Sequence, residues 1–468
     1  MTEPTALEGS ARDVAERIEA AYQRIGVTRA HVGIVAMVLL GVFFDAVEQN
    51  TVGIAGPVLR ESWGLTAADI GLLNTATFTA VALGRLTAGY AMDRFGRRAL
   101  LTVNLLMFSL GSLLCAIAPN HATLVAARFL VGLGLGGEVA VAVIMLAEFF
   151  SARQRGTAIG LINVAAAGLG NMLAPLFGIA VYAVTTGPDR WRWIFGLLVL
   201  PALAVVVYRR NLPETPWFLA SRGRYTEADV VIARLQQGRL TGPVEPSERW
   251  LGPLERIARP ATPLRVPWRV VFRGPYRRVT IAMGVAVCMS YAAQITMLTL
   301  VPVILTDRGI ELTSALWYTL VMQSGSLVGA LAAALIARRL RRRLVLTVGA
   351  ALGVVAALGF GLLGTNVGFA LAFGALFNFA VIVLNTTIWI FAPEQYPTAV
   401  RGVGTSVILA IGSLSAGLFP FVAGVVLDAG GVPVVFLVIS ALFAVCAVAA
   451  RLLPETFGRP LPSTPVDR

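Results

Sequence analysis

Long apolar segments recur along the whole chain and are separated by short polar loops. A helix needs about 20 apolar residues to cross a bilayer, because it rises about 1.5 Å per residue. About twelve segments approach or exceed this length. They cover residues 32–57, 68–91, 99–118, 122–147, 156–184, 191–208, 278–306, 313–337, 344–364, 367–391, 403–427 and 432–453. The pattern predicts an all-α membrane protein with twelve transmembrane helices, for which the lipid bilayer is the main solvent.

The composition agrees with this pattern. Of the 468 residues, 57% are hydrophobic and only 13% are charged, whereas soluble domains are about 45–50% apolar and about 25% charged. All 38 basic side chains are arginines, and the formal net charge is +13. In a membrane protein such an excess is typical of cytoplasmic loops. We therefore expect no nucleic-acid partner.

The arginines are concentrated in alternate loops, around 92–98, 148–155 and 338–343, and throughout 209–277. Because arginine-rich loops stay in the cytoplasm, both termini and segment 209–277 are predicted to be cytoplasmic and the protein to lie in the cell membrane. Apolar residues at helical spacing predict an amphipathic helix near the N-terminus. The expected domains are an N-terminal segment (1–31), a six-helix bundle (32–208), a linker (209–277), a second six-helix bundle (278–453) and a tail (454–468).

The two halves of the chain repeat each other. Three pairs of segments match at offsets of about 241–246 residues: Glu148 and Arg155 with Glu394 and Arg401, residues 212–215 with 453–456, and the 93–98 loop with the arginine run at 338–343. Duplicated bundles with a solute site at their interface are a transporter architecture. The repeat therefore favours two pseudo-symmetric bundles that move a solute.

Particular motifs resemble those of a known family. Gly-Tyr-Ala-Met-Asp-Arg-Phe-Gly-Arg-Arg at 89–98 resembles the signature loop between helices 2 and 3 of the major facilitator superfamily. Residues 128–137 resemble its fourth-helix pattern, and the Pro-Glu-Thr segments after each half resemble its sugar-porter-like branches. Residues 27–31 and 43–46 are similar to the branch with bacterial niacin and aromatic-acid proton symporters.

The resemblance implies alternating access driven by a proton gradient, with an acid on helix 1 and an arginine on helix 4 involved in coupling. In the second copy of the signature loop, Arg338 stands where Asp93 would fall, and no glycine matches Gly96. That copy is therefore expected to have lost its acid.

Ionisable residues inside the predicted helices are the main candidates for chemistry. A charge near the bilayer centre costs about 2.5–3.5 kcal/mol, so it normally faces a cavity and has a partner. The first half carries Asp45, Glu48, Arg85, Arg128 and Glu138, and the helix interiors of the second half carry none. We expect charge chemistry in the first bundle and neutral recognition in the second.

Asp45 is predicted to bind the proton. It lies about twelve residues into helix 1, and Arg128 lies about six residues into the antiparallel helix 4, so the two reach overlapping depths. A carboxylate beside an arginine stays ionised and takes up a proton when the two separate. A structural ion pair is the alternative. Glu48, one turn further along, is expected to line the cavity as an alternative proton carrier to Asp45, or else to be directed to the outer interface.

Arg85 is predicted to bind a substrate carboxylate through a bidentate contact, or else to pair with Glu138 or Asp45. Other polar and aromatic groups at similar depth are expected to line the substrate cavity, with interhelical hydrogen bonding as the alternative for each one. They are Gln49, Asn163, Tyr291, Gln294, Gln323, Asn378, Asn385 and Trp389.

Charged residues and glycines toward the cytoplasmic helix ends are predicted to form a gate. Exposed ion pairs contribute only about 0–1 kcal/mol each, but a network formed only when that side is closed would bias a two-state equilibrium. Helix capping and membrane topology are the alternative roles, and Glu214 fits either. The gate residues are Gly89, Asp93, Arg94, Gly96, Arg97, Arg98, Glu138, Glu148, Arg155, Glu394 and Arg401.

Several kinds of chemistry have no motif in the sequence. There is no phosphate-binding Gly-x-x-x-x-Gly-Lys loop, so ATP is not expected to supply the energy. The two histidines, His31 and His121, lie near helix ends, so no metal or other cofactor is expected. No nucleophile–base set indicates an enzyme.

We predict a monomeric, proton-coupled importer of a small organic solute, with an organic or aromatic carboxylate as the first choice of substrate. Sugar or polyol symport, proton-driven export and a non-transporting sensor are the alternatives.

Overall fold

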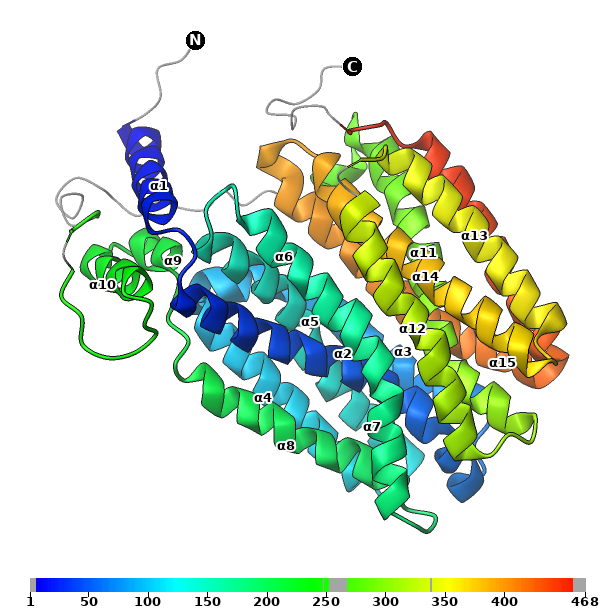
Figure 1. Ribbon diagram of the computed structural model, residues 1–468. Coiled ribbons are helices and arrows are strands. Elements are labelled where there is room, and N and C mark those ends of the chain that lie inside the picture. Colours follow the sequence, from blue (N-terminus) through cyan, green and yellow to red (C-terminus); the bar gives the residue numbers. More distant parts are fainter. Residues whose placement is uncertain (1–5, 247, 252–266, 337–338, 458–468) are drawn as a thin grey trace.

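The computed structural model describes residues 6–246, 248–251, 267–336 and 339–457 (Figure 1). Within these ranges every secondary-structure element is a helix. Most of the predicted tail at 454–468 lies outside the described residues, and so does Arg338.

The first bundle contains six crossing helices. They are α2 (Arg29–Trp63), α3 (Ala67–Phe95), α4 (Arg97–Ala116), α5 (His121–Phe149), a composite fifth helix and α8 (Trp191–Arg209). The composite helix runs through α6 (Arg155–Asn163), the π-helical η1 (Val164–Gly170) and α7 (Asn171–Val184).

The second bundle also contributes six crossings. They are α11 (Tyr276–Asp307), α12 (Leu312–Ile336), α13 (Arg342–Leu363), α14 (Val367–Glu394) and the two legs of α15 (Thr398–Leu452). The legs of α15 meet at Gly431, whose φ of 73° lies in the left-handed region that favours glycine. The predicted twelve-helix fold is therefore confirmed for the described residues.

Equivalent helices begin at equivalent residues in the two halves. The side chain of Asn120 accepts a hydrogen bond from the backbone N–H of Thr123 at the start of α5. Asn366 accepts from the N–H groups of Gly368 and Phe369 at the start of α14, in the same register as Asn120. Such N-caps satisfy donors that the helix itself leaves unpaired. The repeat therefore extends to the capping of single helices.

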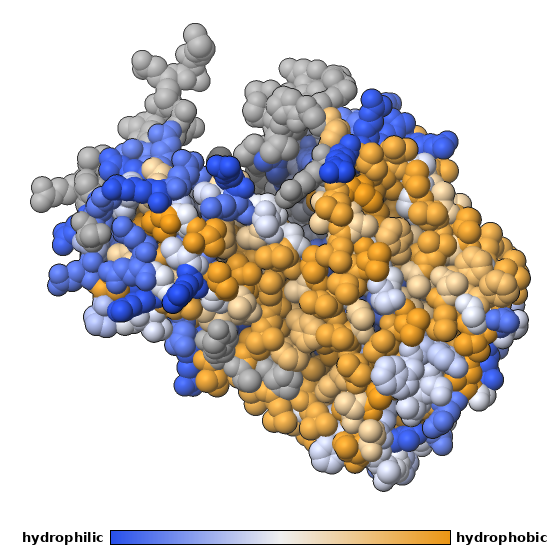
Figure 2. Space-filling model, in the orientation of Figure 1, coloured by the Kyte–Doolittle hydropathy of each residue, from blue (hydrophilic) through white to orange (hydrophobic). Residues whose placement is uncertain are grey.

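The surface is divided into zones (Figure 2). Apolar residues form a broad band, and hydrophilic residues gather at the two ends of the bundles. Large side chains in the band are strongly exposed, for example Leu110 at 52%, Leu203 at 43% and Leu437 at 61%. Because an exposed apolar band of this extent is unstable in water, it indicates the surface that faces lipid.

Three short helices lie at one end of the first bundle, which we call the linker end (Figure 1). They are α1 (Ala6–Ile25), α9 (Pro216–Ser221) and α10 (Tyr225–Gln236). The predicted N-terminal amphipathic helix corresponds to α1, whose Ile18 and Ala21 are fully buried in a cluster shared with α9 and α10. A 3-10 turn, η3 (Trp268–Phe272), precedes the second bundle. The opposite end is called the far end.

The two bundles approach each other closely in their far halves. Glycines allow this: a Cβ atom at Gly71 of α3 would lie 2.5 Å from the carbonyl oxygen of Pro420 in α15, and one at Gly53 of α2 would lie 2.2 Å from that of Leu298 in α11. Neither position has room for a side chain. The far end is thus sealed by backbone-to-backbone packing.

Charged groups join the bundles at the same end. Arg60 of α2 forms an ion pair of 2.5 Å with Asp307 of α11. The carboxylate of Asp428 in α15 accepts hydrogen bonds from the N–H groups of Ala67 and Ala68 at the start of α3. Among the described residues, Arg60–Asp307 is the one ion pair that connects the two bundles.

Candidate functional site

A buried ion pair joins helices α2 and α5. Arg128 forms a charge-assisted hydrogen bond with Glu48, and neither side chain is exposed. Nε of Arg128 also donates to Oγ1 of Thr77 in α3 over 3.0 Å, and its guanidinium lies 5.7 Å from the ring centre of Phe195 in α8. Three neighbouring helices therefore hold this arginine of α5 in place.

The predicted partner of Arg128 was Asp45, and that pairing is wrong. Asp45 lies one turn earlier on α2, and its Oδ2 is buried with no hydrogen-bond partner among the described residues. The two acids differ by three residues, about 4.5 Å of rise and about 60° of rotation. Glu48 points toward α5 at the depth of Arg128, and its predicted alternative position at the outer interface is also wrong.

A second buried ion pair lies nearer the linker end. Glu138 of α5 and Arg209 of α8 are 2.5 Å apart, and both are buried. Nη1 of Arg209 donates to the carbonyl of Leu101. Glu138 therefore pairs with Arg209, and the predicted alternative pairing of Arg85 with Glu138 is wrong.

Sequence reasoning missed Arg209 because it placed this residue in the polar linker. It is the last residue of α8, and its long side chain extends back into the bundle. Its neighbour Arg210 is exposed. Two adjacent arginines at a helix end carry no sequence signal that separates the buried one from the exposed one.

Arg85 of α3 reaches across to the second bundle. Its Nη1 donates to Oγ of Ser413 over 2.6 Å, and to the carbonyl of Leu409 over 3.2 Å, both in α15. Its guanidinium lies 6.0 Å from the ring centre of Tyr291 in α11. No direct ion pair with Asp45 is present among the described contacts. Arg85 is thus a half-buried cation at the bundle interface.

Amide and aromatic groups of α11 and α14 adjoin this cation. Trp389 donates from Nε1 to the hydroxyl of Tyr291 over 2.7 Å. Asn385 donates to Oε1 of Gln294 over 2.5 Å and accepts from the hydroxyl of Ser290 over 2.6 Å. Four of the predicted cavity residues therefore lie in one polar layer of the second bundle.

Other predicted residues form contacts between the bundles. Asn163 of α6 donates to the hydroxyl of Thr386 in α14 over 2.6 Å. Gln323 of α12 donates to Oδ1 of Asn50 over 3.4 Å, and Asn50 in turn donates to Asn171 over 3.0 Å. The structure therefore adds Asn50 to the polar groups at the interface.

Two of the predicted cavity residues are not part of these clusters. Asn378 donates to the carbonyl of Gly374, one turn back on its own helix. The side chain of Gln49 is half-buried and makes no hydrogen bond within the described residues.

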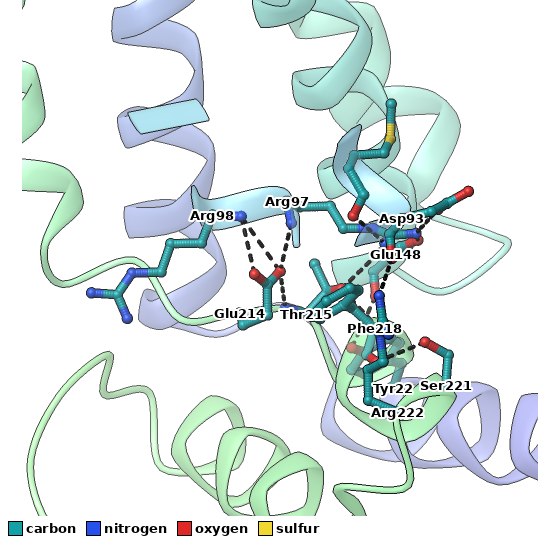
Figure 3. A network of polar contacts seen from close by, with 11 residues as sticks. Tyr22, Asp93, Arg97, Arg98, Glu148, Glu214, Thr215, Phe218, Ser221 and Arg222 are labelled. Carbon is teal, nitrogen blue, oxygen red and sulfur yellow. Dashed lines mark hydrogen bonds and ion pairs between the residues drawn. The ribbon is translucent and has the colours of Figure 1, made fainter. Parts of the chain in front are cut away.

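A polar network at the linker end ties the α3–α4 loop to α5 and α9 (Figure 3). Arg97 forms an ion pair of 2.9 Å with Glu148 and a longer one of 3.4 Å with Asp93. The carboxylate of Glu214 accepts hydrogen bonds from the backbone N–H groups of Arg97 and Arg98. Glu214 therefore caps the start of α4.

Gly96 makes room for this cap. Its φ is 95°, and a Cβ atom there would lie 2.3 Å from Oε2 of Glu214. The hydroxyl of Thr215 completes the network by donating to Glu148 over 2.6 Å.

The second bundle repeats this network. Arg342 pairs with Glu394 over 3.3 Å, and the hydroxyl of Thr456 donates to Glu394 over 2.5 Å. Glu455 accepts from the N–H groups of Arg342 and Arg343, both over 3.1 Å. Glu394 and Glu455 thus correspond to Glu148 and Glu214, whereas Arg338, at the position of Asp93, lies outside the described residues.

The two capping glutamates differ in their electrostatics. Burial raises the pKa of Glu214, against the opposing effect of the hydrogen bonds from Thr215, Arg97 and Arg98. Burial acts in the same direction on Glu455, but backbone N–H donors outweigh it and lower the pKa of that group. The duplicated caps are therefore not equivalent in how they bind protons.

The remaining predicted gate residues are dispersed. Arg155 pairs with Glu19 of α1 over 3.6 Å, and Arg401 donates to the carbonyl of Tyr396 near the start of its own helix. Arg94 bonds to the hydroxyl of Tyr90, one turn back. Gly89 is exposed, and nothing lies within 4 Å of where its Cβ would be. Each described network lies within one bundle, so the gating role stays a prediction.

The structure has two duplicated six-helix bundles, with buried charges in the first and a polar interface between the two. This architecture is found in secondary transporters. The chain belongs to the Major Facilitator Superfamily, which matches residues 38–420. It is thus a multi-pass membrane transporter of small molecules and not an enzyme, as predicted.

Curated relatives and solved structures agree with this assignment. The chain is 29% identical over 459 residues to the niacin transporter NiaP of Acinetobacter baylyi, covering 96% of this chain and 99% of that protein. It is 30% identical over 410 residues to a gallate transporter of Pseudomonas putida, covering 86% and 87%. The xylose transporter XylE of Escherichia coli, in a partially occluded inward-open conformation, shares the fold with a TM-score of 0.74 at 17% identity, covering 92% and 99%.

Proposed function

We propose that the protein imports an organic or aromatic carboxylate together with protons. The observation that carries this proposal is the buried Glu48–Arg128 pair, because a paired intramembrane acid and base is costly and is typical of proton-coupled transporters. Similarity to transporters named for niacin, gallate and 4-hydroxybenzoate supports the substrate class. The linker end faces the cytoplasm in this proposal, since its loops are rich in arginine. The protein lies in the cell membrane and acts as a monomer.

The substrate site lies between Arg85 and the polar layer of α11 and α14. A guanidinium binds a carboxylate through two parallel hydrogen bonds. Among the described residues, the hydrogen bonds of Arg85 go to the neutral oxygens of Ser413 and Leu409. A carboxylate would exchange those contacts for a charge-assisted pair. Tyr291 and Trp389 offer aromatic faces beside it, which suits an aromatic ring.

Proton coupling follows from the Glu48–Arg128 pair. When a proton neutralises Glu48, its attraction to Arg128 is lost, and the guanidinium keeps Thr77 as a partner. The neutral acid no longer holds α2 to α5 by charge, so the bundle can change shape.

The test uses the purified protein in proteoliposomes with an inward proton gradient. Radiolabelled nicotinate, gallate, 4-hydroxybenzoate and xylose are offered separately. We expect one of the carboxylates to accumulate in a gradient-dependent manner. Glu48→Gln should abolish accumulation but keep substrate exchange in the absence of a gradient, because exchange needs no net proton transfer. Arg85→Ala should raise the KM for the carboxylate at least about tenfold, the loss of about 1.4 kcal/mol of binding.

Several outcomes would contradict the proposal. Accumulation of xylose alone would favour sugar symport. Extrusion from loaded vesicles without uptake would favour export. Full gradient-driven accumulation by Glu48→Gln would remove Glu48 from coupling.

A further inference from the structure

We infer that Asp45, Glu138 and Arg209 form a second proton-binding site in the first bundle, separate from the Glu48–Arg128 pair. The inference rests on the proposed function only for the use of this proton in transport. The binding of the proton itself rests on the geometry of α2, α5 and α8.

Arg209 has a fixed position, and three of its five N–H groups are used by neighbouring oxygens. Its Nη2 bonds to Glu138, its Nη1 to the carbonyl of Leu101 over 3.2 Å, and its Nε to the carbonyl of Met37 over 3.4 Å. Three helices therefore orient one guanidinium toward one carboxylate oxygen.

The two remaining N–H groups of Arg209 do not reach the free oxygens of the two neighbouring acids. Oε2 of Glu138 and Oδ2 of Asp45 are both buried and have no hydrogen-bond partner among the described residues. A buried acceptor without a donor is costly, and a bound proton turns one such acid into a donor. A proton bound by either acid therefore supplies a donor that Arg209 does not provide in this geometry.

The charges that face Asp45 come from four helices. They are Glu138 of α5, Arg209 of α8, Arg85 of α3 and Glu48 of α2 itself. Glu48 is already paired with Arg128, and Arg85 reaches toward the second bundle. Asp45 and Glu138 are left to share Arg209. Two acids that share one counter-ion inside a protein bind one proton between them.

The second bundle shows that the fold does not require these charges. Under the offset that aligns the capping residues of α5 and α14, the position of Glu138 corresponds to Leu384. Under the offset that aligns Glu214 with Glu455, the position of Arg209 corresponds to Ala450. Both Leu384 and Ala450 are fully buried. The same bundle is thus built with apolar residues where the first bundle carries an ion pair.

The second site lies on the linker side of the first along α2. Glu48 is the acid nearer the far end, and Asp45 follows one turn closer to the linker end. Glu138 and Arg209 lie nearer still, beside Gly41. Neutral Glu48 can pass its proton to the carboxylate of Asp45. Glu48 is then charged again, and its ion pair with Arg128 re-forms. The second site then holds the proton before its release at the linker end.

The first test is infrared difference spectroscopy of the purified protein without substrate, titrated with acid and base. We expect the C=O band of a neutral buried carboxyl group that disappears as pH rises. Asp45→Asn should remove it, and Glu138→Gln should move its titration to lower pH, because Asp45 then has Arg209 to itself. Glu48→Gln is the control and should leave the band in place.

A double variant guards against simple misfolding. Glu138→Leu with Arg209→Ala reproduces the residues of the second bundle, so the protein should fold and melt as the wild type does. Asp45 then loses the guanidinium of Arg209 and keeps only the charge of Arg85, which reaches toward the second bundle. The C=O band of neutral Asp45 should therefore persist to higher pH than in the wild type. A band that none of these variants alters, or no band at all, would reduce Glu138–Arg209 to a structural ion pair and overturn the inference.

Transport measurements separate this result from the proposed function. In proteoliposomes, Glu138→Gln should shift the pH of half-maximal gradient-driven uptake by about one unit toward acid, with substrate exchange within about twofold of wild type. If wild-type uptake ignores the proton gradient but the band is present, the proposed function fails and the proton site stands. If uptake depends on protons and the band is absent, the proposed function stands and the second proton site fails.

Discussion

The Glu138–Arg209 ion pair occupies the space beside Gly41, so a larger residue has no room there. A Cβ atom at residue 41 would lie 1.8 Å from Nη2 of Arg209 and 2.6 Å from Oε1 of Glu138. Overpacking of a buried site costs about 1–3 kcal/mol, and Arg209 is held here by its bonds to the carbonyls of Leu101 and Met37. We predict that Gly41→Ala lowers the melting temperature in detergent by several degrees, measured with a thiol-independent fluorescence assay.

Gly160 of α6 provides the matched control. It is also inside a helix of the first bundle, and nothing lies within 4 Å of where its Cβ would be. Because alanine favours helix over glycine by up to about 1 kcal/mol, Gly160→Ala should leave the melting temperature unchanged or raise it. An equal loss of melting temperature in both variants would mean that contact with the ion pair is not what excludes a side chain at residue 41.

At this scale the sequence predicted which residue types carry the chemistry but not which atoms meet. The depth of Arg128 along its helix predicts an acid of α2 as its partner, and it does not distinguish Asp45 from Glu48. That choice depends on helix rotation and tilt, which are set by packing against all the neighbours. Arg209 shows the same limit, since the reach of a long side chain decides whether a residue at a helix end is buried.

At the scale of the helices, the duplicated caps of α4 and α13 make opposite predictions about pH. The raised pKa of Glu214 means that its stabilising contribution is present at low pH and is lost as pH rises through that pKa. The lowered pKa of Glu455 means that its contribution is present at neutral pH and is lost as pH falls below the ordinary glutamate range. We predict that Glu455→Gln lowers the melting temperature at pH 7 by about 2 °C.

Glu214→Gln is the internal comparison for this prediction. It should not lower the melting temperature at pH 7, because it removes a charge whose burial is unfavourable. In acid, near pH 4, the effect of Glu455→Gln should shrink as wild-type Glu455 begins to lose its charge. A larger loss at pH 7 in Glu214→Gln than in Glu455→Gln would contradict the assignment of the two caps.

The helices themselves were predictable to a large extent. Apolar length and turn residues fix where a chain can cross a bilayer, so most crossings lie where the sequence placed them. The sequence predicts a break between two crossings at residues 428–431, and the structure has the kink of α15 there, at Gly431. The repeated Leu-Pro-Glu-Thr segment was visible as a repeat, but its use as a helix cap was not, because the cap closes across more than a hundred residues.

At the scale of the whole molecule, the sequence predicts two bundles but not which end is closed. Both states of an alternating-access transporter have the same sequence, so only contacts can distinguish them. Here the far end is closed by glycine packing and by Asp428 on the start of α3. The Arg60–Asp307 ion pair adds a charged contact, with side chains 24% and 49% exposed.

We predict that Asp307→Ala shifts the population toward opening at the far end. A partly exposed ion pair contributes about 0–1 kcal/mol, so the ratio of the two states should change by up to about fivefold. Spin labels at the exposed residues Ala122 and Val367, at the far-end starts of α5 and α14, report the change as a longer distance between the bundles.

Two further variants decide whether charge is the cause. Exchanging the partners, Arg60→Asp with Asp307→Arg, should restore the wild-type distance distribution, because the attraction acts in either direction. Asp189→Ala breaks the 2.9 Å ion pair with Arg192 at the same end but within the first bundle, so it should leave the distribution unchanged. If Asp189→Ala opens the far end as much as Asp307→Ala does, then general loosening rather than the bond between bundles controls the equilibrium. If the exchanged pair stays open, the Arg60–Asp307 contact is a consequence of closure, and the glycine packing alone holds the far end shut.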